Sequence, residues 1–73
     1  MAQITLYAQA NGNWDTANNW NTVAGGGGTA YTNPQNGANT FICDLNSKAI
    51  TFNVSTITVD KIIASDNVSY LNN

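Results

Sequence analysis

The feature that most constrains this chain is the lack of any covalent or metallic support for a small core. The chain has 73 residues with one cysteine and no histidine, so it forms no internal disulfide and no structural zinc site. A single core of this size supplies roughly 3–5 kcal/mol, and natural domains in this range usually add a crosslink, a metal or a partner subunit. We therefore expect one small domain, residues 1–73, that is completed by partner chains.

Charge narrows the function classes further. Charged residues make up 8% of the chain and the formal net charge is −2. Two lysines do not neutralise a row of phosphates or anionic headgroups, so we expect no nucleic-acid partner and no membrane association. No apolar run approaches the roughly 18 residues of a membrane-spanning helix. Hydrophobic residues nevertheless make up 42% of the chain, which predicts a folded protein rather than a disordered one.

Strand-forming residues in period-two alternation predict an all-β fold. A short first strand is expected at Ile4–Ala8, and residues 40–73 are expected to form the β core. The β-favouring runs of this core are Thr40–Leu45, Ala49–Val54, Thr56–Ile63 and Val68–Leu71. No helical period of useful length is present, so the sequence predicts strands joined by turns.

Turn-forming residues organise the first half of the chain. Residues 1–20 are expected to combine the first strand with a turn anchored by Trp14 and Trp20. Residues 21–39 are expected to form a long, flexible Gly/Asn-rich loop, because Gly25–Gly28 has no side chains to pack. A short edge strand around Thr29–Thr32 is the most regular structure that we expect in this loop.

A weak internal similarity lies in the β core. Ile50-Thr51-Phe52-Asn53 and Ile57-Thr58-Val59-Asp60 share an apolar-Thr-apolar-polar pattern. Two copies seven residues apart suggest stacked strands. The alternative is chance recurrence in a β-rich stretch, and the sequence leaves both open.

The segment Gly12–Asn21 resembles the G-x-W-x-x-x-x-N-W opening of bacterial autotransporter-associated β-solenoid repeats and of phage virion proteins. In those proteins a Gly-rich loop, a Pro-x-x-Gly turn and an apolar strand follow in that order. Gly25–Gly28, Pro34–Gly37 and Phe41-Ile42 occupy these places here. Strands resembling Ile50-Thr51-Phe52 and Ile57-Thr58-Val59 come next, so the similarity covers residues 12–63.

The resemblance implies a fold like the cap of a β-solenoid, with a small β-sandwich as the alternative. It also implies a structural, non-catalytic component of a bacteriophage virion, assembled in the host cytoplasm: a capsid decoration or cement protein, or the anchoring end of a head or tail fibre. Its partners would be copies of itself or other virion structural proteins. Members of this family usually continue for many rungs, whereas this sequence stops at Asn73. We therefore expect either a piece of a longer fibre-like protein or a small protein with the same opening.

Residues capable of chemistry are few, and we expect no enzyme, no cofactor and no metal. Asp44 and Asp60 are the carboxylates nearest to a glycosidase pair, but they are expected to be solvent-facing or turn residues. Cys43 has no histidine to activate it and is interpreted as a buried apolar residue. A calcium loop at Asn11–Asp15 would lack its later acidic ligand.

The competing function is an extracellular carbohydrate-binding or adhesin module of a bacterial surface protein. In that case Trp14, Trp20, Tyr7 and Tyr31 would form a stacking platform for sugars. We favour the interpretation that the two tryptophans plug the end of the β core, because a chain this short needs their apolar area inside.

Assembly suits the composition best, because an uncharged polar surface brings copies together without burying unpaired ions. The first strand, with Ile4, Leu6 and Ala8, is a candidate edge for pairing with another chain, and so is Thr56–Ile63. The predicted core and interface anchors are Trp14, Trp20, Phe41, Ile50, Phe52, Ile57 and Val59.

Overall fold

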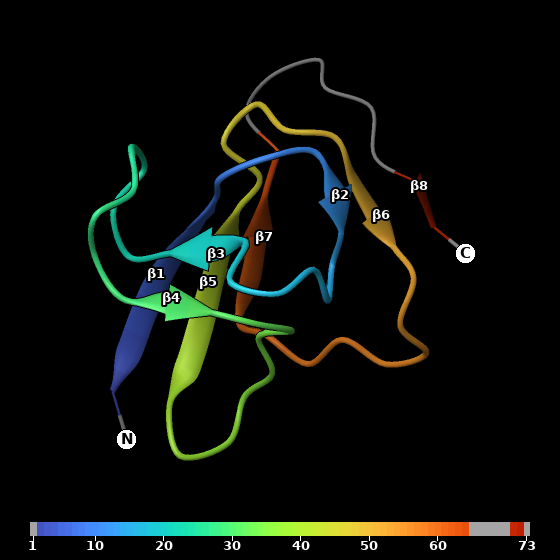
Figure 1. The fold of residues 1–73 in the computed structure, drawn as a ribbon. Helices are drawn as coiled ribbons and strands as arrows, with labels where there is room; N and C mark the ends of the chain where they lie inside the picture. Colours follow the sequence, from blue (N-terminus) through green and yellow to red (C-terminus); the bar gives the residue numbers. More distant parts are fainter. Residues whose placement is uncertain (1, 65–70, 73) are drawn as a thin grey trace.

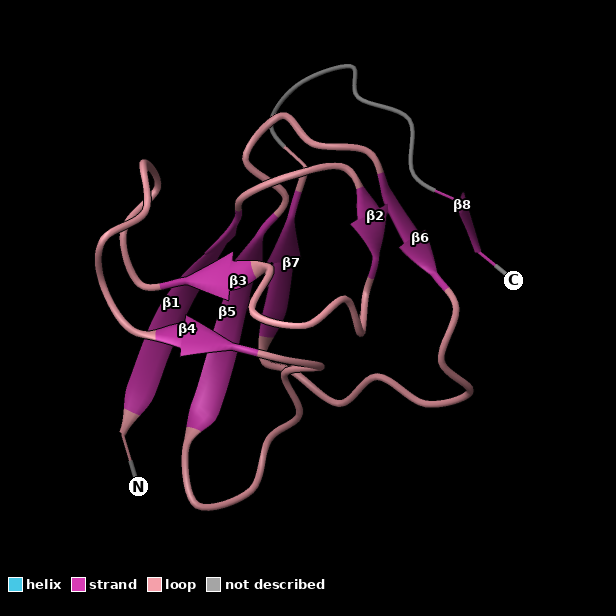
Figure 2. Ribbon diagram, viewed as in Figure 1, coloured by secondary structure: helices cyan, strands magenta, loops and turns pink. Residues whose placement is uncertain are grey.

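Eight short strands make up the regular structure in the computed structural model, which describes residues 2–64 and 71–72 (Figure 1). They are β1 (Gln3–Ala8), β2 (Gly12–Asn13), β3 (Trp20–Asn21), β4 (Ala30–Tyr31), β5 (Thr40–Asp44), β6 (Ile50–Phe52), β7 (Lys61–Ile63) and β8 (Leu71–Asn72). Figure 2 shows strands and loops without a helix over these residues. The prediction of an all-β fold is confirmed.

Two parallel ladders define the architecture. In the five-stranded sheet β5 lies between β1 and β7 and runs parallel to both, and in the three-stranded sheet β6 does the same between β2 and β8. From Ile42 to its partner Lys61 is 19 residues, and from Thr51 to its partner Leu71 is 20. The chain therefore winds as a coil, with β1–β2, β5–β6 and β7–β8 as successive turns. Such winding is that of a β-solenoid rather than of an antiparallel sandwich.

A third side of the coil is joined by hydrogen bonds outside regular strands. The Asn36 N–H donates to the Thr58 carbonyl at 2.6 Å. The Gln35 side chain donates to the Thr56 carbonyl at 2.8 Å and accepts the Thr58 N–H at 2.6 Å. One side-chain amide thus satisfies a backbone acceptor and a backbone donor, as a neighbouring strand would.

The first turn of the coil carries an insert. From Gln3 to its partner Thr40 is 37 residues, which is 18 more than the spacing of 19 between β5 and β7. The extra residues follow β2 and precede Pro34, and they include β3 and β4. β3 folds back antiparallel onto Tyr7 and Ala8 of β1 (Figure 1). We call residues 14–33 the closing insert.

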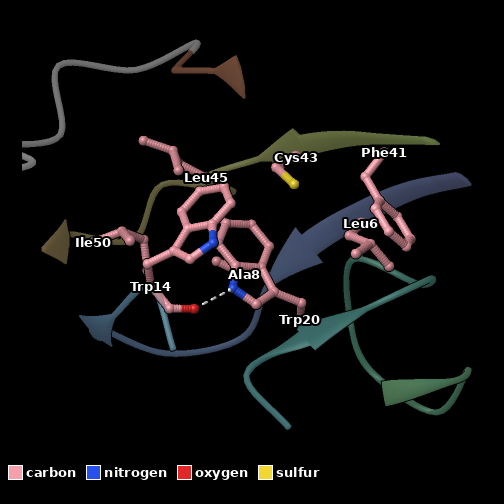
Figure 3. Close-up of a cluster of buried hydrophobic side chains, with 8 residues drawn as sticks. All are labelled: Leu6, Ala8, Trp14, Trp20, Phe41, Cys43, Leu45 and Ile50. Atoms are coloured by element: carbon pink, nitrogen blue, oxygen red, sulfur yellow. Dashed lines mark hydrogen bonds between the residues drawn. The ribbon is translucent and has the colours of Figure 1, made fainter. Parts of the chain in front are cut away.

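Inward-facing side chains stack in columns across the coil. Leu6 and Cys43 are paired in register and have 0% exposure, and Ile62 is the next residue in the same column. Phe52, Ile57 and Val59, three of the predicted anchors, are partly buried against the core. The buried core consists of Leu6, Ala8, Trp14, Trp20, Phe41, Cys43, Leu45 and Ile50 (Figure 3).

Two predictions in the β core are wrong. The predicted strand Thr56–Ile63 begins only at Lys61, because its first half bonds to Gln35 and Asn36 on the third side. The two similar segments seven residues apart do not stack, since β6 pairs with β2 and β8. Residues 68–70 of the predicted strand Val68–Leu71 lie outside the described residues.

The predicted edge strand Ile4–Ala8 is an inner strand of its sheet. β1 lies between β3 and β5, and Leu6 and Ala8 are fully buried in the core. The sequence gave no warning of this, because the pairing of β1 with β3 depends on the closing insert folding back. That pairing covers Tyr7 and Ala8 alone, so the earlier part of β1 has no strand on its β3 side among the described residues.

Asp60 joins several turns of the coil at the corner before β7. Its carboxylate accepts hydrogen bonds from Gln3 Nε2 at 2.8 Å and Asn36 Nδ2 at 3.0 Å, and from the Thr40 side chain. Bonds from Gln3 first, then Thr40 and Asn36, favour the ionised carboxylate. They hold the pKa of Asp60 below its ordinary value of 3.8.

Acid is expected to destabilise this corner. A lowered pKa contributes stability that is complete above the unfolded-state value and is lost as pH falls through the folded-state value. We therefore expect Asp60→Asn to remove part of the fall in melting temperature between about pH 4 and about pH 2. Circular dichroism melts measure it, with Asp15→Asn, which loses a carboxylate bonded to the Asn53 amide, as the control. An Asp60→Asn profile identical to wild type would contradict the assignment.

Candidate functional site

Cys43, the one thiol of the chain, is built into the core rather than into a reactive site. Its side chain has 0% exposure, and burial raises the pKa of the thiol to about 12. A thiol with that pKa stays protonated at neutral pH and is a poor nucleophile. Cys43 therefore fills a column of the coil, between Leu6 and Ile62.

The candidate carboxylates and calcium ligands are used in turns. Asp44 accepts the Asn46 N–H at 2.8 Å, and Asn11 Oδ1 accepts the Ala49 N–H at 2.9 Å. Asp15 accepts the Asn53 amide at 2.9 Å. Within the described residues there is no group of three or more side chains that holds a metal ion, and no pocket is present. No helix in this part of the chain is long and apolar enough to cross a membrane.

Trp14 and Trp20 form the centre of the closing insert. Their rings lie 4.7 Å apart between centroids at 54°, and Phe52 meets Trp14 edge-on at 5.5 Å. The Trp20 indole N–H donates to the Trp14 carbonyl at 3.0 Å (Figure 3). The Trp14 indole N–H donates to the Pro34 carbonyl at 3.3 Å. Both large rings are thus fully buried with their polar atoms satisfied.

The other residues of the G-x-W-x-x-x-x-N-W opening fix the path of the insert. The Asn19 side chain accepts the Ala10 N–H at 2.9 Å and donates to the Ala10 carbonyl at 3.0 Å. A Cβ on Gly12 would lie 3.0 Å from Thr16 Oγ1, which accepts the Asn13 N–H. The spacing of the motif therefore reflects two ring plugs, one amide clamp and one close approach.

Side-chain amides also hold the glycine-rich turn between β3 and β4, which was predicted to be a flexible loop. Asn21 Oδ1 accepts the N–H groups of Val23 and Gly28 at 2.9 and 3.0 Å. Asn46 Nδ2 donates to the carbonyls of Ala8 and Ala24 at 2.9 and 3.0 Å. A Cβ on Gly28 would collide with the Thr22 hydroxyl, so this close return of the chain requires glycine.

The four aromatic residues proposed as a sugar platform do not form one. Trp14 and Trp20 have 0% exposure. Tyr31 is half-buried and packs edge-on against Phe41, at 5.4 Å between ring centroids. Tyr7, also half-buried, is paired with Asn21 of β3. The rings therefore serve the interior of the coil.

The edge of β7 that faces away from β5 is the most distinctive surface of the described residues, and we call it the open end. Ile62 continues the inward column of Leu6 and Cys43, yet 38% of it is exposed. The coil is closed at its first turn by the closing insert, whereas no described strand pairs with the outer side of β7. An inward apolar side chain and an unpaired backbone edge together form a surface for strand addition.

Sequence reasoning missed the amide side chains that shape both parts of this site. Gln9 donates to the Val23 carbonyl at 3.2 Å, and Asn19, Gln35 and Asn46 clamp backbone groups in the same way. The signal was the high Asn and Gln content, but composition alone does not say which amide meets which backbone group.

Comparison with known proteins gives no match to any protein-family model, curated protein or solved structure. The resemblance of residues 12–63 to solenoid openings therefore stays a prediction. The function has to be argued from the geometry of the coil.

Trp20→Phe tests the closing bond of the insert. The substitution keeps an aromatic ring but leaves the buried Trp14 carbonyl without its donor. Because an unsatisfied buried acceptor costs about 1–3 kcal/mol, we expect a loss of this size in the free energy of unfolding. Urea unfolding followed by circular dichroism measures it. Val23→Ala, at a side chain 49% exposed, should change stability by less than about 0.5 kcal/mol; equal effects would argue against the bond.

Tryptophan fluorescence tests the burial of the platform residues. We expect emission shifted to shorter wavelength than in the urea-unfolded chain and little quenching by acrylamide, because both indoles are shielded from water. Titration with a panel of mono- and oligosaccharides should leave the spectrum unchanged. A saturable, sugar-dependent change would instead support the carbohydrate-binding function.

Proposed function

We propose that this protein is a structural, non-catalytic component of a bacteriophage virion that acts by β-rich protein–protein assembly. The observation that carries the proposal is the open end, where the inward-facing Ile62 is 38% exposed. A coil that stops with an apolar column uncovered is stabilised by whatever strand is added next. The partners are copies of the chain or other virion structural proteins.

The surface chemistry supports assembly over catalysis. The chain carries six charged side chains, four acidic and two basic, so large areas approach a partner without stranding unpaired ions. Its hydrogen-bonding capacity lies in Asn, Gln and Thr side chains, which bond equally well within and between chains. No group in the described part combines a nucleophile with an activating base: Cys43 is protonated and buried.

Two places in a particle suit a coil with one closed and one open end. The anchoring end of a head or tail fibre would use the closing insert as its terminus and the open end for continuation. A capsid decoration or cement protein would use the open end to join an edge strand of the shell. The resemblance of Gly12–Asn21 to virion solenoid openings supports both.

The alternative, an extracellular carbohydrate-binding or adhesin module, is less well supported. Its stacking platform depended on Trp14 and Trp20, whose rings are buried. An adhesin that binds protein rather than sugar remains compatible with the open end, and its location would be the bacterial surface.

Localisation tests the proposal. An antibody raised against the chain should label density-purified phage particles from cultures that carry its coding sequence, and mass spectrometry of the same particles should recover its peptides. Lysate from which particles have been removed is the matched control. Recovery of the chain on the surface of host cells, with none in the particles, would contradict the virion function and favour the adhesin.

A further inference from the structure

The first half of β1 presents free backbone groups on one side. The Thr40 N–H donates to the Ala2 carbonyl at 2.8 Å, which fixes the phase of the ladder between β1 and β5. Because backbone groups alternate in direction along a strand, Ile4 faces β5 while Gln3 and Thr5 face the opposite way. On that side β3 pairs with Tyr7 and Ala8 alone, so the groups of Gln3 and Thr5 are outside its reach.

β7 presents the complementary set at the other end of the same sheet. The Leu45 N–H donates to the Ile63 carbonyl at 2.8 Å. Ile63 therefore faces β5, and by the same alternation the N–H and C=O of Ile62 face away from it. The open end thus offers one donor and one acceptor from a single residue.

The two edges match in one register. In a parallel pair, a residue bonds to the residues before and after its partner on the neighbouring strand. With Ile62 opposite Ile4 of another copy, the Ile62 N–H meets the Gln3 carbonyl and the Thr5 N–H meets the Ile62 carbonyl. A shift by two residues would need the Tyr7 N–H, which lies on the side paired with β3.

The side chains agree with this register. Ile62 and Ile4 both lie in inward-facing columns, because Ile62 pairs with the buried Cys43 and Ile4 pairs with the buried Phe41. Their contact would cover the exposed part of Ile62 and continue the apolar core from one copy into the next. Lys61 would lie opposite Gln3 and meet no like charge.

We propose that a second copy of this chain binds head to tail, with β7 of one copy adding in parallel to Gln3–Thr5 of the next. The contact continues the β1–β5–β7 sheet across the interface. Since the two surfaces differ, each copy keeps one free edge after binding, and the contact propagates into a filament rather than closing as a dimer. The inference rests on the proposed assembly function and names its partner and register.

Two variants block one edge each. Thr5→Pro removes the donor on β1, and proline is tolerated where the N–H points away from the paired strand. Ile62→Asp places a charge on the apolar column of β7. By light scattering, wild type should grow beyond dimer with concentration, whereas each variant alone should stay at the monomer mass of 7.7 kDa. An equimolar mixture of the two should form a one-to-one heterodimer, because each retains the edge that the other lacks.

Val23→Asp is the matched control, since Val23 is an exposed large apolar side chain that belongs to neither edge; it should assemble as wild type does. Hydrogen exchange on the wild-type chain gives a readout without substitution. The amides of Thr5 and Ile62 should slow at least tenfold on assembly, while that of Ile4, which faces β5, should not change.

Three outcomes would overturn the head-to-tail register. They are dimers of Thr5→Pro alone, which indicate pairing of β7 with β7, unchanged assembly of both variants, and a wild-type chain that stays monomeric. None of these bears on whether antibody labels phage particles, so failure of the register and failure of the virion function remain distinguishable.

Discussion

The hydrogen bond from the Trp20 indole to the Trp14 carbonyl is the interaction on which the rest of the coil depends. It holds two large rings against each other at the first turn, where a solenoid would otherwise expose its interior. It also brings the chain back so that β3 meets β1. With no disulfide to brace it, a chain of this length is stabilised chiefly by such a compact, fully satisfied apolar cluster.

Side-chain amides perform most of the remaining work of joining one turn to the next. Gln35 bridges two backbone groups on the third side, and Asn19 clamps Ala10 beneath the tryptophans. These bonds are neutral, so they place no net charge between stacked turns. The composition that excluded catalysis and nucleic-acid binding is thus the one that lets irregular segments pack as closely as strands.

Part of this architecture could be predicted from the sequence. Trp14 and Trp20 were predicted as plugs, and the β-favouring runs located β1, β5 and β6 to within two residues at each end. The pairing could not be predicted, because a coil of 19 or 20 residues per turn brings together segments with no recurring motif. The visible similarity of Ile50–Asn53 to Ile57–Asp60 misled, since it relates two sides of one turn. The inner position of β1 depends on the insert, whose path is set by individual amide contacts.

The place of β1 between β3 and β5 also has a kinetic meaning. Ala8 and its β3 partner Trp20 are 12 residues apart, whereas Leu6 and its β5 partner Cys43 are 37 apart. The entropy of loop closure makes the longer connection costlier by about 1 kcal/mol. During synthesis the tryptophan end also leaves the ribosome first. It can therefore serve as a nucleus, on which later turns condense one after another as they emerge.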